Sequence, residues 1–476
     1  MNHKHRGPRR SLRKIRIVDP RKLRTTVAGT AVGNFMEWYD YGVYGFLATT
    51  IASVFFPAGS GVALLATFAV LAVSFGVRPI GGIIFGMLAD RVGRKRILMI
   101  TILMMAVGTF IIGLLPGYAT FGVWALVLLI ACRVVQGFST GGEYVDAMVY
   151  INEHAPDRRR GFWASFLPVG TLSGYVVGAG LVTLLNVGLT NEQMTSWGWR
   201  IPFLLALVIG MVGLYIRLKL EESPVYQEQE KQRTAPTTSR HPHRRRENRS
   251  QLRKTIVEQW RPLLIVIGLV LAVNVATYML TYLPSYLKAV VGVGDTRALV
   301  IVLIVLVVLV VTVTMSARLS DRIGRRPVMF VGCAILLVAS IPAFLLMQAG
   351  SNVFIFIGAM LVGVMLLCFT AVEPATLPSM FPTEVRGGGV SIGYNISVTA
   401  FGGTTPVIVQ GLISATGNSL MPAFYLMLAG AIGIVAVAMT REPAGRPLPL
   451  ARPAAESYEE AREMAGLDQP REASQT

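Results

Sequence analysis

Residues 86–96 read GMLADRVGRKR, and residues 317–326 repeat the pattern as ARLSDRIGRR. A second pattern, Pro-x3-Arg-Gly, occurs at residues 156–161 and again at residues 382–387. The two offsets, 231 and 226 positions, are nearly equal, so both patterns occupy the same place in two parts of the chain. Such internal duplication indicates that the chain consists of two structurally equivalent halves.

The chain around these patterns is too apolar for a soluble domain of 476 residues, because 53% of it is hydrophobic, only 15% is charged and the mean hydropathy is +0.56. A helix needs roughly 20 mostly apolar residues to span a bilayer. Runs of this kind are found at 27–54, 62–88, 96–115, 121–149, 161–186, 200–217, 262–287, 297–316, 327–348, 352–377, 388–414 and 421–440.

Strands are the competing interpretation, because the run at 301–314 is rich in β-branched residues. That run is uniformly apolar, however, whereas a membrane-barrel strand alternates at every second residue. The sequence therefore predicts an all-α membrane protein with twelve transmembrane helices in two pseudo-symmetric six-helix bundles.

The positive charge lies almost entirely on one side of this predicted topology. If the N-terminus is cytoplasmic, 39 of the 44 Lys and Arg residues fall on the cytoplasmic side, which is the distribution typical of multi-pass membrane proteins. The formal net charge of +18 therefore favours contact with membrane lipid over nucleic-acid binding. We expect a cell-membrane protein with both termini in the cytoplasm.

Five segments follow from the spans and the polar interruption between them. They are a basic cytoplasmic N-terminus (1–26), an N-terminal six-helix bundle (27–217), a cytoplasmic linker (218–261), a C-terminal six-helix bundle (262–440) and a cytoplasmic tail (441–476).

The first span carries ionisable groups, which are costly at membrane depth and so indicate a functional site. Glu37 and Asp40 lie roughly 15–20 Å inside the cytoplasmic end at a rise of about 1.5 Å per residue. Helical spacing places Asn34, Glu37, Tyr41 and Tyr44 on one face.

The fourth span repeats this spacing in Arg133, Gln136, Thr140 and Glu143, with Tyr144 beside them. We expect the two polar stripes to face each other across a solvated cavity. All five histidines lie outside the spans, so carboxylates are the expected proton carriers, with Glu37, Asp40 and Glu143 as candidates. The alternative is a buried ion pair of purely structural value, formed by Glu37 or Asp40 with Arg133 or Arg78.

Candidate substrate contacts come from the same two spans. Arg133 suits a carboxylate, and Trp38, Tyr41, Tyr44 and Tyr144 offer aromatic faces to a quaternary nitrogen. Polar contacts are expected from Asn34, Gln136 and Thr140. Packing is the competing role for the aromatic residues.

The duplicated loops have a different expected role, because their charges lie at helix ends. Ion pairs and hydrogen bonds there would hold the cytoplasmic side shut in one state and release it in the other. The gating candidates are Gly86, Asp90, Arg91, Gly93, Arg94, Asp321, Arg322, Gly324 and Arg325. Positive-inside charge without a gating role is the alternative.

The duplicated loop resembles the signature of the major facilitator superfamily, with Ala317 in the place of a glycine. Within it, three stretches resemble the metabolite:proton symporter family: residues 33–45 (GNFMEWYDYGVYG), 136–144 (QGFSTGGEY) and 198–203 (GWRIPF). Residues 277–287, 368–370 and 377–383 favour its members that carry compatible solutes. The resemblance implies proton symport of a small polar metabolite by alternating access, with proline or glycine betaine as the expected substrate.

Other function classes stay open at this stage. Related members carry organic acids such as 2-oxoglutarate, citrate or shikimate, and Arg78 with Arg133 would suit a dianion. A non-transporting membrane receptor is the alternative from a different class. No nucleotide-binding loop or nucleophile constellation is present, and Cys132, Cys333 and Cys368 lack metal-ligand spacing, so no enzyme activity, cofactor, metal or obligate protein partner is expected.

Overall fold

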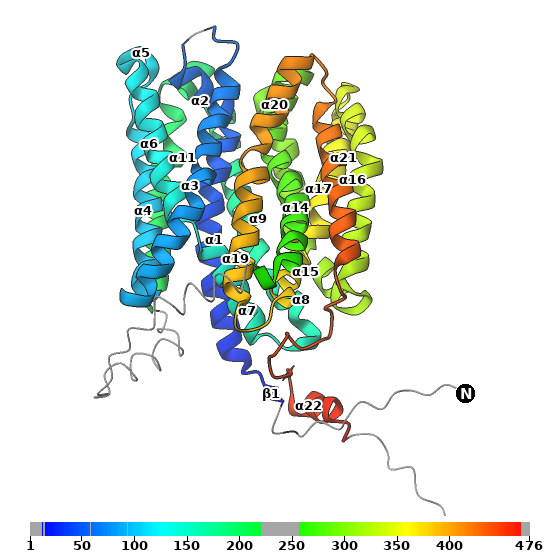
Figure 1. Ribbon diagram of the computed structural model, residues 1–476. Helices are drawn as coiled ribbons and strands as arrows, with labels where there is room; N and C mark the ends of the chain where they lie inside the picture. The colour runs from blue at the N-terminus through cyan, green and yellow to red at the C-terminus, as the bar shows by residue number, and fades with distance from the viewer. Residues whose placement is uncertain (1–11, 13–14, 58, 93, 220–256, 468–476) are drawn as a thin grey trace, which may run out of the picture.

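The computed structural model describes residues 12, 15–57, 59–92, 94–219 and 257–467, which form two groups of long helices side by side (Figure 1). The predicted linker lies for the most part outside these residues. In the first half, the helices are α1 (Pro20–Phe46), α2 (Ala48–Phe55), α3 (Ala63–Val92), α4 (Arg94–Leu114), α5 (Tyr118–Phe121), α6 (Val123–Ser139), α7 (Glu143–His154), η2 (Asp157–Arg159), α8 (Arg160–Ala164), α9 (Phe166–Gly188), α10 (Asn191–Gln193), η3 (Met194–Gly198) and α11 (Arg200–Lys219).

The second half has the same plan of six long helical segments. Its helices are α14 (Trp260–Tyr286), η5 (Leu287–Val291), α15 (Asp295–Ile323), α16 (Arg325–Gln348), α17 (Asn352–Thr370), α18 (Glu373–Thr376), η6 (Leu377–Met380), α19 (Arg386–Ser397), η7 (Val398–Gly402), α20 (Thr405–Thr416) and α21 (Met421–Met439). A last helix, α22 (Tyr458–Ala465), lies in the tail.

Twelve helical segments of the described chain coincide with the twelve predicted spans. Nine are long and apolar enough to cross a membrane by length and hydropathy, and the pair 191–198 with 200–215, bent by 42°, makes a tenth. The segment Met99–Leu114 of α4 is apolar but shorter, and α1 carries Glu37 and Asp40 in its buried half.

Glycine allows the helices of the first half to approach closely, as membrane helix packing requires. A Cβ atom added at Gly170 of α9 would lie 2.4 Å from the carbonyl oxygen of Ala31, and one at Gly174 would lie 2.4 Å from that of Phe35. These glycines therefore hold α9 against α1. On its other side α9 packs against α15, so it joins the two halves.

Two helix boundaries differ from the predicted ones. The first helix begins at Pro20 rather than at residue 27, because the Asp19 side chain accepts hydrogen bonds from the backbone N–H groups of Arg21 and Lys22 and so caps the helix. The predicted span 121–149 is one membrane-length span, Val123–His154, but a bend at residues 140–142 divides it into α6 and α7.

The two ends of the described chain meet. Strand β1 (Arg16–Ile17) pairs in parallel with β2 (Ala454–Ala455), at the end of the molecule where α1 begins (Figure 1). Ion pairs hold the tail against the first half, from Arg159 to Glu456 at 2.8 Å and from Arg158 to Glu463 at 2.8 Å. Both termini of the membrane-spanning part therefore lie on one face of the molecule.

Candidate functional site

A buried ion pair lies where the two halves meet. Arg78 of α3 donates to a carboxylate oxygen of Glu37 of α1 at 2.5 Å. Both side chains are buried, with exposed fractions of 1% and 2%. Arg78 also donates to the carbonyl oxygen of Thr140 at 3.4 Å. The second carboxylate oxygen of Glu37 and two guanidinium nitrogens of Arg78 have no hydrogen-bond partner among the described residues.

Aromatic side chains from both halves gather beside this ion pair. The Trp38 ring lies 5.5 Å from Tyr175, 6.0 Å from Tyr41, 6.1 Å from Tyr278 and 6.5 Å from Tyr144, measured between ring centroids. Tyr278 belongs to α14 of the second half, whereas the other four belong to the first. We call these five residues the aromatic cluster.

Aromatic rings also lie close to the Arg78 guanidinium. The Arg78 carbon Cζ is 5.9 Å from the Tyr41 ring centroid and 5.5 Å from that of Phe75. Ring stacking also joins the two halves, because the ring of Tyr144 is stacked on that of Tyr394 of α19, with 5.1 Å between the ring centroids. The hydroxyl oxygens of Tyr175 and Tyr278 are buried and without a described partner, so hydrogen-bonding capacity remains at the centre.

A second ion pair is enclosed within the first half. Asp40 accepts hydrogen bonds from Arg133 at 3.1 Å, from Gln136 at 3.0 Å and from Thr109 of α4 at 2.8 Å. The Arg133 guanidinium lies 3.9 Å from the centroid of the Tyr44 ring. The two predicted polar stripes thus face each other as expected, with contacts between α1, α4 and α6 inside the first half.

The remaining predicted contacts have other partners. Asn34 donates to the carbonyl oxygen of Leu167 and accepts from the Trp38 indole at 2.8 Å, so it holds Trp38 in place. Tyr44 donates to the carbonyl oxygen of Thr67 at 3.0 Å. The Thr140 hydroxyl lies 3.3 Å from that of Tyr41. Glu143 begins α7, beyond the bend, and lies near enough to Glu37 for the two charges to interact.

A solvated cavity was predicted between the stripes, and the structure differs from this expectation. Trp38, Tyr175 and Tyr278 are at most 3% exposed, and their rings fill the space between the halves. The halves also touch directly, because Thr399 donates to the carbonyl oxygen of Phe75 at 2.9 Å and Asn395 to that of Gly141 at 3.1 Å. The structure is therefore closed at its centre, with buried polar atoms in place of an open chamber.

Several central residues were absent from the predicted site. Arg78 carried a signal, since it is an arginine inside a span, and its pairing with Glu37 is one of the ion pairs that the sequence left open. Tyr175, Tyr278 and Tyr394 lie on other helices and carry no periodic signal of their own. Glu373 of α18 is also buried at 5% exposure, and its oxygen Oε1 has no described partner.

The second copy of the loop signature joins the two halves at the face that holds the termini. Asp321, near the end of α15, accepts hydrogen bonds from the backbone N–H groups of Gly161 at 2.9 Å and Phe162 at 2.8 Å, both in α8 of the first half. Arg325 lies 3.4 Å from Asp321 and donates to the carbonyl oxygen of Ala375 at 2.8 Å. Gly324 has a positive φ of 103°, which glycine adopts without strain.

The first copy of the signature is not described to the same extent. The structure does not describe the side chains of Asp90, Arg91 and Arg94, the exposure of Gly86 or any part of Gly93. Arg322, in the second copy, is exposed. The Pro-x3-Arg-Gly repeat supplies another contact between the halves, because Arg386 lies 2.7 Å from Glu153 of α7.

Comparison with known proteins gives a family and two named relatives. Residues 26–453 match the family model described as Sugar (and other) transporter. The chain is 41% identical to the Proline/betaine transporter of Escherichia coli (strain K12), over 95% of this chain and 90% of that protein. It is 39% identical to the Glycine betaine/proline/ectoine/pipecolic acid transporter OusA of Dickeya dadantii (strain 3937), over 94% of this chain and 89% of that protein.

Among solved structures, the chain is similar to the major facilitator superfamily proton:xylose symporter XylE of E. coli. The TM-score is 0.66 at 18% sequence identity, and the match covers 93% of this chain and 98% of the other. The predicted fold of two pseudo-symmetric six-helix bundles is thereby confirmed.

Proposed function

Because the chain belongs to the Sugar (and other) transporter family and has the major facilitator fold, we propose that it carries a small zwitterionic compatible solute, such as proline or glycine betaine, across the membrane together with a proton. The observation that carries this proposal is the aromatic cluster beside the Glu37–Arg78 ion pair, at the meeting point of the two halves. The names of the two relatives point to the same class of solute.

The chemistry of the site suits both ends of such a solute. Aromatic faces attract quaternary and other ammonium groups, by about 2 kcal/mol when the cation is desolvated. Arg78 offers a guanidinium, the group best suited to a carboxylate, with two nitrogens that have no described partner. A solute that carries a cation and a carboxylate would thus meet a matching group at each end.

The ion pair also supplies a reason for coupling to a proton. While Glu37 is ionised, it balances the charge of Arg78. A proton on Glu37 removes that balance and leaves the guanidinium free to bind the solute carboxylate. Proton and solute therefore bind together, and the release of either one lowers the affinity of the site for the other. Glu37 is the proton carrier that this geometry favours, over Asp40, whose oxygens accept three hydrogen bonds inside the first half.

Alternating access needs contacts that close each side in turn. The Asp321 and Arg386 contacts join the halves at the face that holds the termini, which the charge distribution places in the cytoplasm. In our proposal they hold the cytoplasmic side shut, and their release opens the site inward. The predicted segments, 1–26, 27–217, 218–261, 262–440 and 441–476, are kept as part of this proposal.

Replacement of Asp321 by asparagine is expected to shift the protein toward the inward-open state. Each charge-assisted hydrogen bond to Asp321 contributes about 1.5–3 kcal/mol, so the closed population should fall about tenfold or more. Spin labels at Arg159 and Glu384, on the two halves, would report the change as a longer distance. Arg441→Gln, an exposed arginine that follows α21 on the same face, is the matched control and should leave the distance unchanged. An unchanged distance in Asp321→Asn would remove this residue from gating.

An organic acid is the second candidate, and the arrangement of charges disfavours it. A dianion would need two available cations at the centre. Arg133 is paired with Asp40 and covered by Tyr44 within the first half, and Arg78 is already paired with Glu37. Only one guanidinium becomes available when Glu37 takes a proton, which matches a single carboxylate.

Uptake by purified protein in proteoliposomes tests the proposed function. With an inward proton gradient, we expect labelled proline or glycine betaine to accumulate and labelled 2-oxoglutarate to remain at background. Protein-free liposomes and a protonophore are the controls. Accumulation of the dicarboxylate alone would favour the organic-acid symporter, and movement of no solute would favour a non-transporting receptor.

A further inference from the structure

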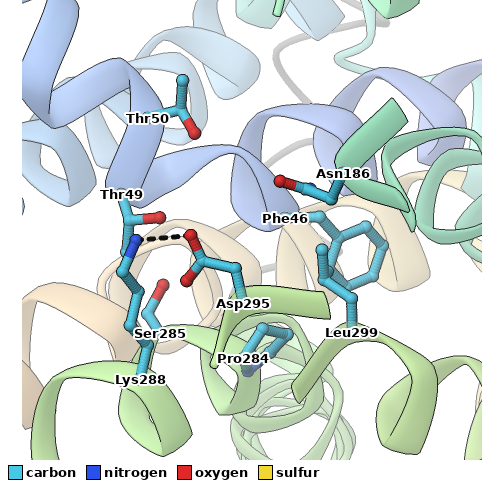
Figure 2. Close-up of a pocket in the computed structure, with 9 residues that line it drawn as sticks. All are labelled: Phe46, Thr49, Thr50, Asn186, Pro284, Ser285, Lys288, Asp295 and Leu299. Carbon is cyan, nitrogen blue, oxygen red and sulfur yellow. Dashed lines mark hydrogen bonds and ion pairs between the residues drawn. The ribbon is translucent and has the colours of Figure 1, made fainter. Parts of the chain in front are cut away.

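A small polar pocket lies beside Phe46 (Figure 2), which ends α1, so it is at the opposite end of that helix from the paired strands β1 and β2. Its polar lining comes from Thr49, Thr50, Asn186, Ser285, Lys288 and Asp295. Lys288 donates to Asp295 at 2.6 Å, and these side chains are 42% and 31% exposed. The pocket therefore holds one cation and one anion, both in reach of solvent.

Both halves of the molecule build this pocket. Thr49 and Thr50 belong to α2, and Asn186 belongs to α9, all in the first half. Lys288 and Asp295 belong to η5 and α15 of the second half. In this closed structure the pocket has room for about one water molecule, a volume of about 10 Å³, and a rocking motion of one half against the other would widen it enough to admit a solute.

One aromatic side chain separates the pocket from the aromatic cluster. Phe46 lines the pocket (Figure 2), and its ring lies 6.1 Å from that of Tyr175, a member of the cluster. Tyr175 in turn lies 5.5 Å from Trp38. A Cβ atom at Gly42 would lie 2.7 Å from the Tyr175 ring, so the absence of a side chain there lets Tyr175 occupy this position. The pocket and the cluster are thus neighbours, with Phe46 on the pocket side and Tyr175 on the cluster side.

We propose that this pocket is the external entry site for a small zwitterion, and that Phe46, packed against Tyr175 of the aromatic cluster, forms the barrier between it and the central site. The inference rests on the proposed function, because the chain's charge distribution places this end outside and the solute class comes from the central site. The carboxylate of an arriving zwitterion pairs with Lys288 and its ammonium group with Asp295. The solute thereby replaces one ion pair with two, and no charge is left unbalanced.

Protection from thiol labelling tests whether solute occupies the pocket. In a variant with Cys132, Cys333 and Cys368 replaced by alanine, Thr50→Cys should react with a membrane-impermeant thiol reagent added outside. Saturating glycine betaine is expected to slow that reaction at least threefold. Val62→Cys, which is exposed at the same end, is the control and should react equally with and without solute.

Transport kinetics give a second measurement on the ion pair. Lys288→Met and Asp295→Asn should each raise the half-saturating solute concentration about fivefold while the maximal rate stays within twofold. An exposed ion pair contributes little to stability, so both variants should fold. Arg297→Gln, an exposed cation two residues beyond Asp295, should have no effect.

The results separate this inference from the proposed function. If the wild type transports no zwitterion, the proposed function fails. If the wild type transports glycine betaine but Thr50→Cys is not protected and the half-saturating concentrations are unchanged, the entry site is wrong and the proposed function stands.

Discussion

Replacement of Arg78 by glutamine is expected to reduce solute uptake at least about 100-fold. The change removes the guanidinium that receives the solute carboxylate in our proposal. It also leaves Glu37 buried without its cation, and breaking a buried ion pair on one side costs about 3–5 kcal/mol. That cost lowers stability; the loss of uptake follows from two lost charge-assisted hydrogen bonds to the solute carboxylate, which at about 1.5–3 kcal/mol each correspond to at least about 100-fold in binding. Uptake of labelled glycine betaine into proteoliposomes measures the effect.

Three further variants separate binding from folding. Arg78→Lys keeps the charge without the planar fork and should retain part of the activity. Glu37→Gln combined with Arg78→Gln removes both charges, so it should regain thermal stability without regaining uptake. Arg133→Gln removes a buried cation inside the first half and should lower stability, yet leave the half-saturating solute concentration unchanged. Normal uptake by Arg78→Gln would exclude Arg78 from the site.

Replacement of Glu37 by glutamine is expected to abolish proton-driven accumulation while solute exchange continues. Glutamine cannot carry a proton through the cycle, but it leaves Arg78 available for the carboxylate. A membrane potential of about 100 mV supplies about 2.3 kcal/mol per charge, enough to concentrate a solute about fifty-fold with one proton. In Glu37→Gln vesicles we expect the accumulation ratio to fall to about one.

Counterflow, in which unlabelled solute inside drives entry of labelled solute, measures the exchange that should persist. Asp40→Asn is the matched control, because it also neutralises a buried carboxylate that is paired with an arginine. It should lower thermal stability and retain accumulation in the protein that folds. If Glu37→Gln accumulates solute as the wild type does, the proton is carried elsewhere, with Glu143 and Glu373 as the next residues to test.

The fold could be predicted from the sequence because its evidence is local and repeated. Each span is a continuous apolar run, and the duplicated loops mark equal positions in the two halves. The bend at 140–142 was missed because the helical spacing of polar residues continues through it from Gln136 to Glu143. In the structure Gly141 lies against α3, where a Cβ atom would be 2.2 Å from the Arg78 carbonyl oxygen.

Site residues could be predicted only where their spacing along a single helix indicates a shared polar face. Asp40 with Arg133 is one of the ion pairs that the sequence left open, and that contact is present, together with one from Gln136 that was not predicted. Spacing could not show that Thr109 of a third helix completes their surroundings, which places them inside the first half. Tyr278 reaches Trp38 from the other half of the chain, a contact that depends on how the bundles dock. The roles of these residues stay predictions.

The pairing of β1 with β2 limits how many times the chain can cross the membrane. Two strands joined by backbone hydrogen bonds occupy the same compartment, and they flank the first and last helices of the membrane part. The polypeptide must therefore traverse the bilayer an even number of times. An odd number of crossings, such as nine or eleven, is therefore impossible. The helices with the weakest hydropathy signal are α1, α4 and α11, and they cannot be left out singly: if α11 crosses the bilayer, then α1 and α4 either both cross it or both do not.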